Sequence, residues 1–255
     1  MTVRASLRVL AMALLLLVCL PSLGVAKLFG RGGGVVRLFL AGVAWLLGLR
    51  ITVRGQPVAD HVLYVGNHIS WLDIPALGGT RYTRFVAKSQ IEGWPLIGWL
   101  ATISGSVFVS RESRSATRRQ ADAMVAALAA GYPVGLFPEG GTADGVTLDP
   151  FRPALFAAAV EAGVKVQPIA IDYGLRGPEI AWPDGTSFSA ELKRMLSRAA
   201  PVPVTLHFLA PLEAKAMNRK VIAAETYREI ATALGHDPIV AAAATGSVVR
   251  LSAES

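Results

Sequence analysis

Beyond Thr52 the chain alternates apolar segments of strand length with segments of helical spacing, and this alternation constrains the fold most strongly. Six segments favour strands: residues 61–66, 84–87, 106–109, 134–137, 164–171 and 202–208. Three favour helices: residues 116–130, residues 151–162, and a segment that Asn218 caps and that runs to Leu234. The pattern predicts an α/β fold in which helices flank a largely parallel mixed sheet. Catalytic groups are expected in the loops at the strand ends.

The first fifty residues differ from the rest because they carry two long apolar runs. Residues 9–25 are apolar apart from Ser22, and residues 35–49 are interrupted only by Arg37. The first run is near the length that spans a bilayer, whereas the second is too short to span comfortably. The glycine-rich stretch 30–34 predicts a hinge between them. We therefore expect a hydrophobic two-helix membrane-binding segment that folds back as a hairpin in one leaflet.

The distribution of charge supports contact with a membrane. Residues 1–60 hold seven basic residues and one acidic residue, whereas the remainder holds 18 basic and 17 acidic residues. The basic excess therefore belongs to the most hydrophobic part of the chain. Anionic lipid headgroups fit this pairing better than nucleic acid, which requires a basic stripe on the folded body.

A cleaved signal peptide is the competing interpretation of the N-terminus. A basic start, an apolar middle and the small residues 24–26 are typical of one. The second apolar run and the single cysteine, Cys19, argue against a secreted protein. We expect membrane-associating helices over residues 1–50, one domain over residues 51–240 and a flexible tail over residues 241–255.

A polar loop after the first predicted strand of the body contains Asn67, His68 and Asp73. A histidine that is held at one ring nitrogen can accept a proton at the other. Positions five apart on a continuous helix face different directions, so we expect a turn leading into a helix to bring Asp73 back to His68. A lone histidine beside a lone aspartate is more often structural than catalytic, so the spacing alone leaves both interpretations open.

A second loop, residues 137–145, follows another predicted strand and contains Glu139, Gly140 and Gly141. Consecutive glycines expose backbone N–H groups that can bind an anion or a developing oxyanion. Glu139 adds a carboxylate that can contact a substrate hydroxyl or hold the loop. An ordinary glycine-rich turn explains the same residues.

Arg111 follows the strand predicted at residues 106–109. A guanidinium there can grip a phosphate or carboxylate with two N–H groups, or form a salt bridge. The nucleotide-binding loops and the nucleophile elbow are missing from the sequence, which disfavours a kinase, a dehydrogenase or a serine hydrolase. Four dispersed histidines and one cysteine make a transition-metal site improbable.

In this order the motifs resemble those of the glycerolipid acyltransferase family, whose best-known members are lysophosphatidic acid acyltransferases. Residues 67–73 resemble its N-H-x4-D motif, residues 105–111 its second block, residues 137–142 its F-P-E-G-T block and residues 166–169 its V-x-P-I block. The run Phe85-Val86-Ala87-Lys88 also has the look of the family. The resemblance covers roughly residues 52–210.

The resemblance implies acyl transfer from acyl-CoA or acyl-carrier protein to a lysolipid hydroxyl, with no cofactor and no metal. His68 would be the general base, and Asp73 would orient its ring and stabilise the imidazolium. Substrate binding would fall to Asn67, Lys88, Arg111, Glu139, Gly140, Gly141, Thr142 and Arg152. The protein would work at the cell inner membrane, with its site on the cytoplasmic face.

The acceptor is the open point of this resemblance. Many phosphate-acceptor members carry an arginine directly after the F-P-E-G-T block. Here Gly141 stands where threonine is usual and Ala143-Asp144-Gly145 follows Thr142, so that arginine is missing. This variant is similar to the branch that acylates lyso-ornithine lipid to ornithine lipid. Arg152 could replace the missing guanidinium, so 1-acylglycerol-3-phosphate, giving phosphatidic acid, ranks first on family breadth and lyso-ornithine lipid second.

Two hypotheses from other classes also remain. A noncatalytic lipid-binding protein could keep the fold without activity, although the intact His68 and Asp73 argue against it. A hydrolase would release fatty acid to water, and the missing nucleophile elbow makes it weak.

Overall fold

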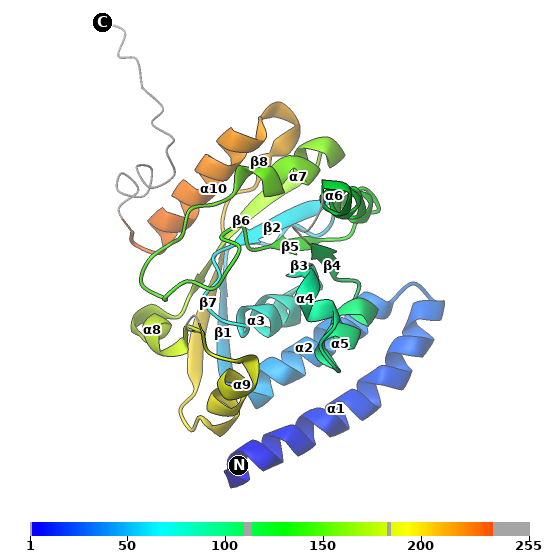
Figure 1. Ribbon diagram of the computed structural model, residues 1–255, viewed down its shortest axis with the longest axis vertical. Helices are drawn as coiled ribbons and strands as arrows, with labels where there is room; N and C mark the ends of the chain where they lie inside the picture. Colours follow the sequence, from blue (N-terminus) through cyan, green and yellow to red (C-terminus); the bar gives the residue numbers. More distant parts are fainter. Residues whose placement is uncertain (1, 110–113, 183–184, 237–255) are drawn as a thin grey trace, which may run out of the picture.

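The computed structural model describes residues 2–109, 114–182 and 185–236 (Figure 1). Eight strands form one sheet in the order β1-β7-β6-β2-β5-β3-β4, and β8 pairs with β6 outside this path. The strands are β1 (Leu49–Arg54), β2 (Val62–Gly66), β3 (Arg84–Lys88), β4 (Val107–Val109), β5 (Val134–Leu136), β6 (Lys165–Asp172), β7 (Val202–Phe208) and β8 (Leu212–Glu213). The pairs of β6 with β7 and β8 are antiparallel, and the remaining pairs are parallel. The predicted mixed, largely parallel sheet is confirmed.

Helices cover both faces of this sheet (Figure 1). The α-helices are α1 (Val3–Leu28), α2 (Gly32–Leu46), α3 (Asp73–Thr80), α4 (Ser89–Glu92), α5 (Ile97–Ser104), α6 (Arg114–Ala129), α7 (Ala157–Ala162), α8 (Gly177–Ile180), α9 (Phe188–Ser197) and α10 (Arg219–Ala233). Short 3-10 helices are η1 (Pro153–Phe156), η2 (Gly174–Arg176) and η3 (Ala214–Ala216). One hydrophobic cluster packs α2, α3 and α9 against the sheet, and a second packs α6, α7 and α10.

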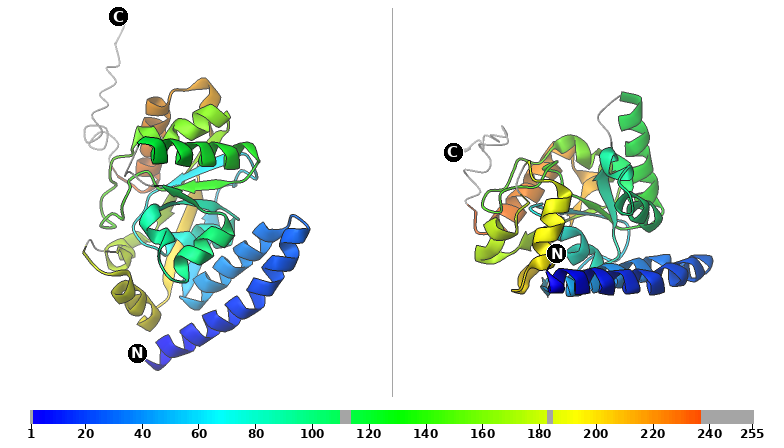
Figure 2. Two further views of the ribbon diagram at one scale, coloured as in Figure 1. Left: turned by 45° about the vertical axis from the view of Figure 1, so that its right-hand side comes forward. Right: turned by 60° about the horizontal axis from the view of Figure 1, so that its bottom comes forward.

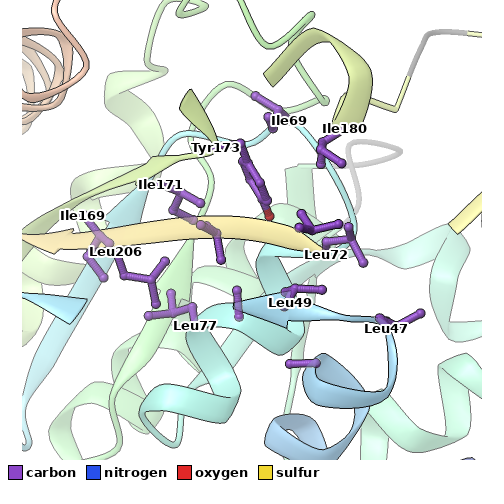
Figure 3. Packing of buried hydrophobic residues seen from close by; sticks show 14 of the residues in the cluster. Leu47, Leu49, Ile69, Leu72, Leu77, Ile169, Ile171, Tyr173, Ile180 and Leu206 are labelled. Atoms are coloured by element: carbon purple, nitrogen blue, oxygen red, sulfur yellow. The ribbon is translucent and has the colours of Figure 1, made fainter. Parts of the chain in front are cut away.

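The central strand β2 is buried on both faces, which explains why it could be predicted from its apolar sequence. All five residues of β2 are buried, because β5 and β6 flank it and helices cover both of its faces. Such a strand is a continuous apolar run. Part of the first cluster is shown in Figure 3, where Leu77 of α3 and Leu206 of β7 approach the side chains of β6.

The two N-terminal helices form an antiparallel hairpin, as predicted (Figures 1 and 2). The predicted hinge is shorter than expected, because Gly32 already begins α2. The glycines there serve packing: a Cβ on Gly33 would lie 2.6 Å from the ring of Tyr82. By length and composition α1 could cross a membrane.

Several elements differ from the sequence prediction. Neither β1 nor α9 was predicted, and only the first residue of β1, Leu49, falls within the second apolar run. The predicted helix at residues 151–162 divides into η1 and α7, and Pro153 begins η1, where its missing N–H is harmless. Asn218 caps α10 as predicted, since its side chain accepts the N–H groups of Lys220 and Val221. The tail predicted at residues 241–255 lies outside the described residues.

Candidate active site

The loop between β2 and α3 folds Asp73 back onto His68. Asp73 begins α3, and its N–H donates to the carbonyl of Ser70 at 3.1 Å. This turn places Oδ2 of Asp73 2.8 Å from Nδ1 of His68. The contact that we expected from a turn leading into a helix is therefore observed.

Asp73 is fully buried and accepts hydrogen bonds at both carboxylate oxygens. Besides His68, Oδ2 accepts the N–H groups of Ile69 and Ser70, both at 3.0 Å. Oδ1 accepts the hydroxyl of Tyr173 at 2.7 Å. These four donors fix the position of the carboxylate. Sequence reasoning missed Tyr173, although it directly follows the strand that contains the V-Q-P-I block.

The imidazole of His68 is fixed on one face by Phe137. The two rings are stacked with centroids 4.2 Å apart and an angle of 12° between their planes. The His68 side chain is 20% exposed, so solvent or a ligand reaches the ring. Within the described part of the chain no hydrogen bond occupies Nε2. With Nδ1–H donated to Asp73, Nε2 is the nitrogen that can take a proton.

Glu139 connects the two site loops. Oε1 accepts the N–H of His68 at 2.6 Å, and Oε2 accepts the N–H of Asp149 at 3.1 Å. Burial raises the pKa of Glu139 to about 8, although these two N–H groups oppose the shift. These contacts hold the loops, and the expected substrate contact of Glu139 stays a prediction.

The glycine loop after Glu139 is attached to the same histidine loop. The N–H of Ala143 donates to the carbonyl of His68 at 2.7 Å, and the hydroxyl of Thr142 donates to the carbonyl of Trp182 at 3.0 Å. Gly140 has a φ of +83°, a region that favours glycine. A Cβ on Gly141 would meet no atom within 4 Å, so open space adjoins its backbone.

Asn67 ties the end of β2 to β6. Its side-chain amide donates to the carbonyl of Ile171 at 3.0 Å and accepts the N–H of Ile171 at 2.8 Å. It is buried. Asn67 therefore fixes the strand end from which His68 projects, and its expected role in substrate binding stays a prediction.

Two of the three predicted cationic ligands, Lys88 and Arg152, lie at the same carboxyl edge of the sheet. Lys88 is exposed at the end of β3, where it pairs in register with Val109 of β4. Arg152 is exposed, and its N–H donates to the carbonyl of Pro138 at 3.1 Å. Arg111 lies outside the described residues. Their headgroup contacts stay predictions.

A groove of about 630 Å³ lies between β4 and α6, and His68 is not among its lining residues. Its walls are mostly small or apolar: Gly105, Ser106, Val107, Phe108, Ala123, Ala126, Ala127 and Ala130, with Arg84 and Glu92. Among the residues that the structure describes, no three His, Cys, Asp or Glu side chains are grouped as a metal site would require.

Comparison with known proteins relates this site to one family. A family model described as Acyltransferase matches residues 50–172, which include both site loops. The chain is 33% identical over 221 residues to the lyso-ornithine lipid O-acyltransferase of Pseudomonas aeruginosa, with 84% of this chain and 83% of that protein covered. It is 37% identical over 147 residues to the 1-acyl-sn-glycerol-3-phosphate acyltransferase of Neisseria gonorrhoeae, with 56% of each covered.

A solved structure has a similar fold. The crystal structure of the 1-acyl-sn-glycerophosphate (LPA) acyltransferase, PlsC, from Thermotoga maritima aligns with a TM-score of 0.68 at 18% identity. The alignment covers 91% of this chain and 97% of that chain.

Proposed function

Because the chain belongs to the acyltransferase family, we propose that it moves a fatty acyl group from an acyl thioester to the free hydroxyl of a lysolipid. The observation that carries the proposal is the imidazole of His68, held at Nδ1 by a buried carboxylate and partly exposed to a ligand. This is the arrangement of a general base.

In the proposed reaction Nε2 of His68 takes the proton of the lysolipid hydroxyl. The hydroxyl oxygen attacks the thioester carbonyl, and backbone N–H groups around Gly140 and Gly141 stabilise the oxyanion. The intermediate expels the thiolate, which receives the proton from the imidazolium. The products are the acylated lipid and the free thiol carrier, and Asp73 stabilises the imidazolium between the two proton transfers.

Lyso-ornithine lipid is the acceptor that we place first. The relative matched over 83% of its own length carries that name, and Gly141 replaces the usual threonine of the phosphate-acceptor motif. Lysophosphatidic acid is the second candidate. The Neisseria gonorrhoeae relative supports it, and Arg152 is exposed beside Pro138 of the motif.

We place the active site at a membrane surface, with α1 and α2 in one leaflet. Both ends of α1 are tied to the body: the guanidinium of Arg8 donates to the carbonyls of Met195, Leu196 and Arg198, and Lys27 donates to the carbonyl of Ile103. Figure 2 shows α1 lying beside α2 along one side of the molecule. A helix attached at both ends supports anchoring along the membrane rather than across it. The inner membrane and its cytoplasmic face are part of this proposal.

An acyl-transfer assay that combines each acyl donor with each lysolipid acceptor tests the function. The purified chain in phospholipid nanodiscs receives labelled acyl-CoA or acyl-carrier protein, with lyso-ornithine lipid or lysophosphatidic acid. We expect labelled ornithine lipid from one of the two donors, and labelled phosphatidic acid alone would make the second acceptor the true one. Labelled free fatty acid without any acceptor would indicate a hydrolase, and no turnover with any pair would favour a noncatalytic lipid-binding protein.

Thiol labelling tests the placement of α1. In a Cys19→Ser background, Thr2→Cys and Phe29→Cys place one thiol just beyond each end of the helix. Both thiols should react with an impermeant reagent from the same face of native membrane vesicles. Labelling from opposite faces would show that α1 crosses the bilayer.

A further inference from the structure

Tyr173 is a buried side chain that contacts the site aspartate at the carboxylate oxygen that His68 does not touch. It directly follows β6, is 4% exposed, and its hydroxyl lies 2.7 Å from Oδ1 of Asp73. Figure 3 shows it beside Ile69 and Leu72 of the site loop, with its hydroxyl oxygen directed into the cluster. His68, Asp73 and Tyr173 therefore form one hydrogen-bonded chain whose last member is sealed from solvent.

We propose that Tyr173 is a positioning residue that sets the proton affinity of His68 through Asp73. The proposal rests on the proposed role of His68 as general base. The hydroxyl draws negative charge toward Oδ1, the oxygen that does not contact His68. If this donor is removed, more charge resides on Oδ2, which stabilises the imidazolium and raises the pKa of His68. A general base works best when its pKa lies near the working pH, and the tyrosine would tune His68 toward that condition through the aspartate.

Tyr173 is suited to this role because it stays a donor. Burial, the nearby charge of Asp73 and the hydrogen bond to Asp73 together hold the pKa of Tyr173 well above its ordinary value. The phenol is therefore protonated across the range in which an imidazole titrates.

The other titratable groups near the pair are few. Among the described residues, Glu139 faces it from the loop after β5, where Oε1 accepts the N–H of His68. Asp149 contacts Glu139, because the N–H of Asp149 donates to the second carboxylate oxygen of Glu139. The carboxylate of Asp172 is turned to the N–H of Gly174, at 2.6 Å. These groups are unchanged when Tyr173 is altered, so a difference between variants reports on the tyrosine hydroxyl.

The test is an NMR titration of the His68 ring in ¹³C-histidine-labelled protein, assigned with His68→Gln, alongside the pH profile of kcat/KM. In Tyr173→Phe the pKa of His68 and the acidic limb of the profile should both rise by about half to one pH unit. Tyr64→Phe is the matched control, because Tyr64 is equally buried in the same cluster and its hydroxyl donates to the carbonyl of Val58. An unchanged pKa of His68 in folded Tyr173→Phe would overturn the proposal.

A second variant covers the case in which Tyr173→Phe does not fold. Replacing Tyr173 by 3-fluorotyrosine keeps the ring and the hydroxyl but makes the phenol a stronger donor, so the pKa of His68 should fall. A pKa that stays or rises would contradict the proposal. The titration needs no substrate, so it remains decisive if acyl transfer fails. If the wild-type protein shows no acyl transfer, that result would count against the proposed function and not against the proposed role of Tyr173.

Discussion

Nδ1 of His68 lies 2.8 Å from Oδ2 of Asp73, although five residues separate them along the chain. The contact exists because the chain turns at Ser70 and begins α3 only at Asp73. The N–H groups of Ile69 and Ser70 hold the same oxygen, so the carboxylate is fixed before any substrate arrives. The geometry assigns the proton of neutral His68 to Nδ1 and leaves Nε2 to react.

Asp73→Asn should damage both activity and stability. Asparagine offers one acceptor oxygen and an NH2 group, whereas the native carboxylate receives donors at both oxygens. At least one buried donor loses its acceptor, which should lower the free energy of unfolding by about 1–3 kcal/mol. The wrong tautomer of His68 becomes favoured, so kcat should fall by roughly a hundredfold or more. Urea unfolding and steady-state kinetics check the two effects, and a kcat near the wild-type value would show that the carboxylate does not assist the base.

Phe137→Leu should lower activity more than stability. Leucine fills most of the volume but removes the flat surface on which the His68 ring is stacked. We expect kcat to fall by roughly three- to tenfold, because this change corresponds to the free energy of one aromatic contact. Phe151→Leu is the matched control, because it removes an aromatic pair with Tyr227 in the other hydrophobic cluster. Equal effects of the two variants on kcat would mean that the stacking has no specific role.

Glu139 should make the stability of the protein depend on pH. Its pKa rises from 4.5 to about 8 in the folded chain, so the folded state holds the proton more tightly than the unfolded state. The free energy of unfolding should therefore decrease as the pH rises through this window, and the decrease should level off above it. Glu139→Gln should flatten the dependence, whereas Glu161→Gln, an exposed substitution on α7, should not. Denaturant unfolding between pH 5 and 8.5 measures this, and identical slopes would show that Glu139 remains ionised throughout.

Gly79→Ala should separate α2 from α3. A Cβ on Gly79 would lie 2.7 Å from backbone atoms of Ala41, which cannot move aside as a flexible side chain can. The expected loss in the free energy of unfolding is about 1–3 kcal/mol. Gly34→Ala on α2 is the control, because a Cβ there would meet no atom within 4 Å, and it should stabilise by about 0.5–1 kcal/mol. Thermal unfolding in the same detergent compares the two, and a neutral Gly79→Ala would show that α2 is not seated on the body.

The parts of this molecule that the sequence predicts are those governed by local pattern. Buried strands such as β2 are apolar runs, and the contact of His68 with Asp73 needs only one turn of chain. The contacts that were not predicted depend on strand order. Tyr173 is 100 residues from Asp73, and Glu139 is 71 residues from His68. Both reach the site because β6 and β5 flank β2, an arrangement that alternation alone does not determine.

In the proposed reaction everything depends on His68, which removes the proton from the lysolipid hydroxyl. The most direct measurement is acyl transfer by His68→Ala in nanodiscs, with vesicle binding and thermal unfolding recorded on the same preparation and His236→Ala as control. We expect turnover by His68→Ala to fall by at least about a hundredfold while membrane binding and unfolding stay unchanged. Turnover by folded His68→Ala close to that of the wild-type protein would contradict this role of His68.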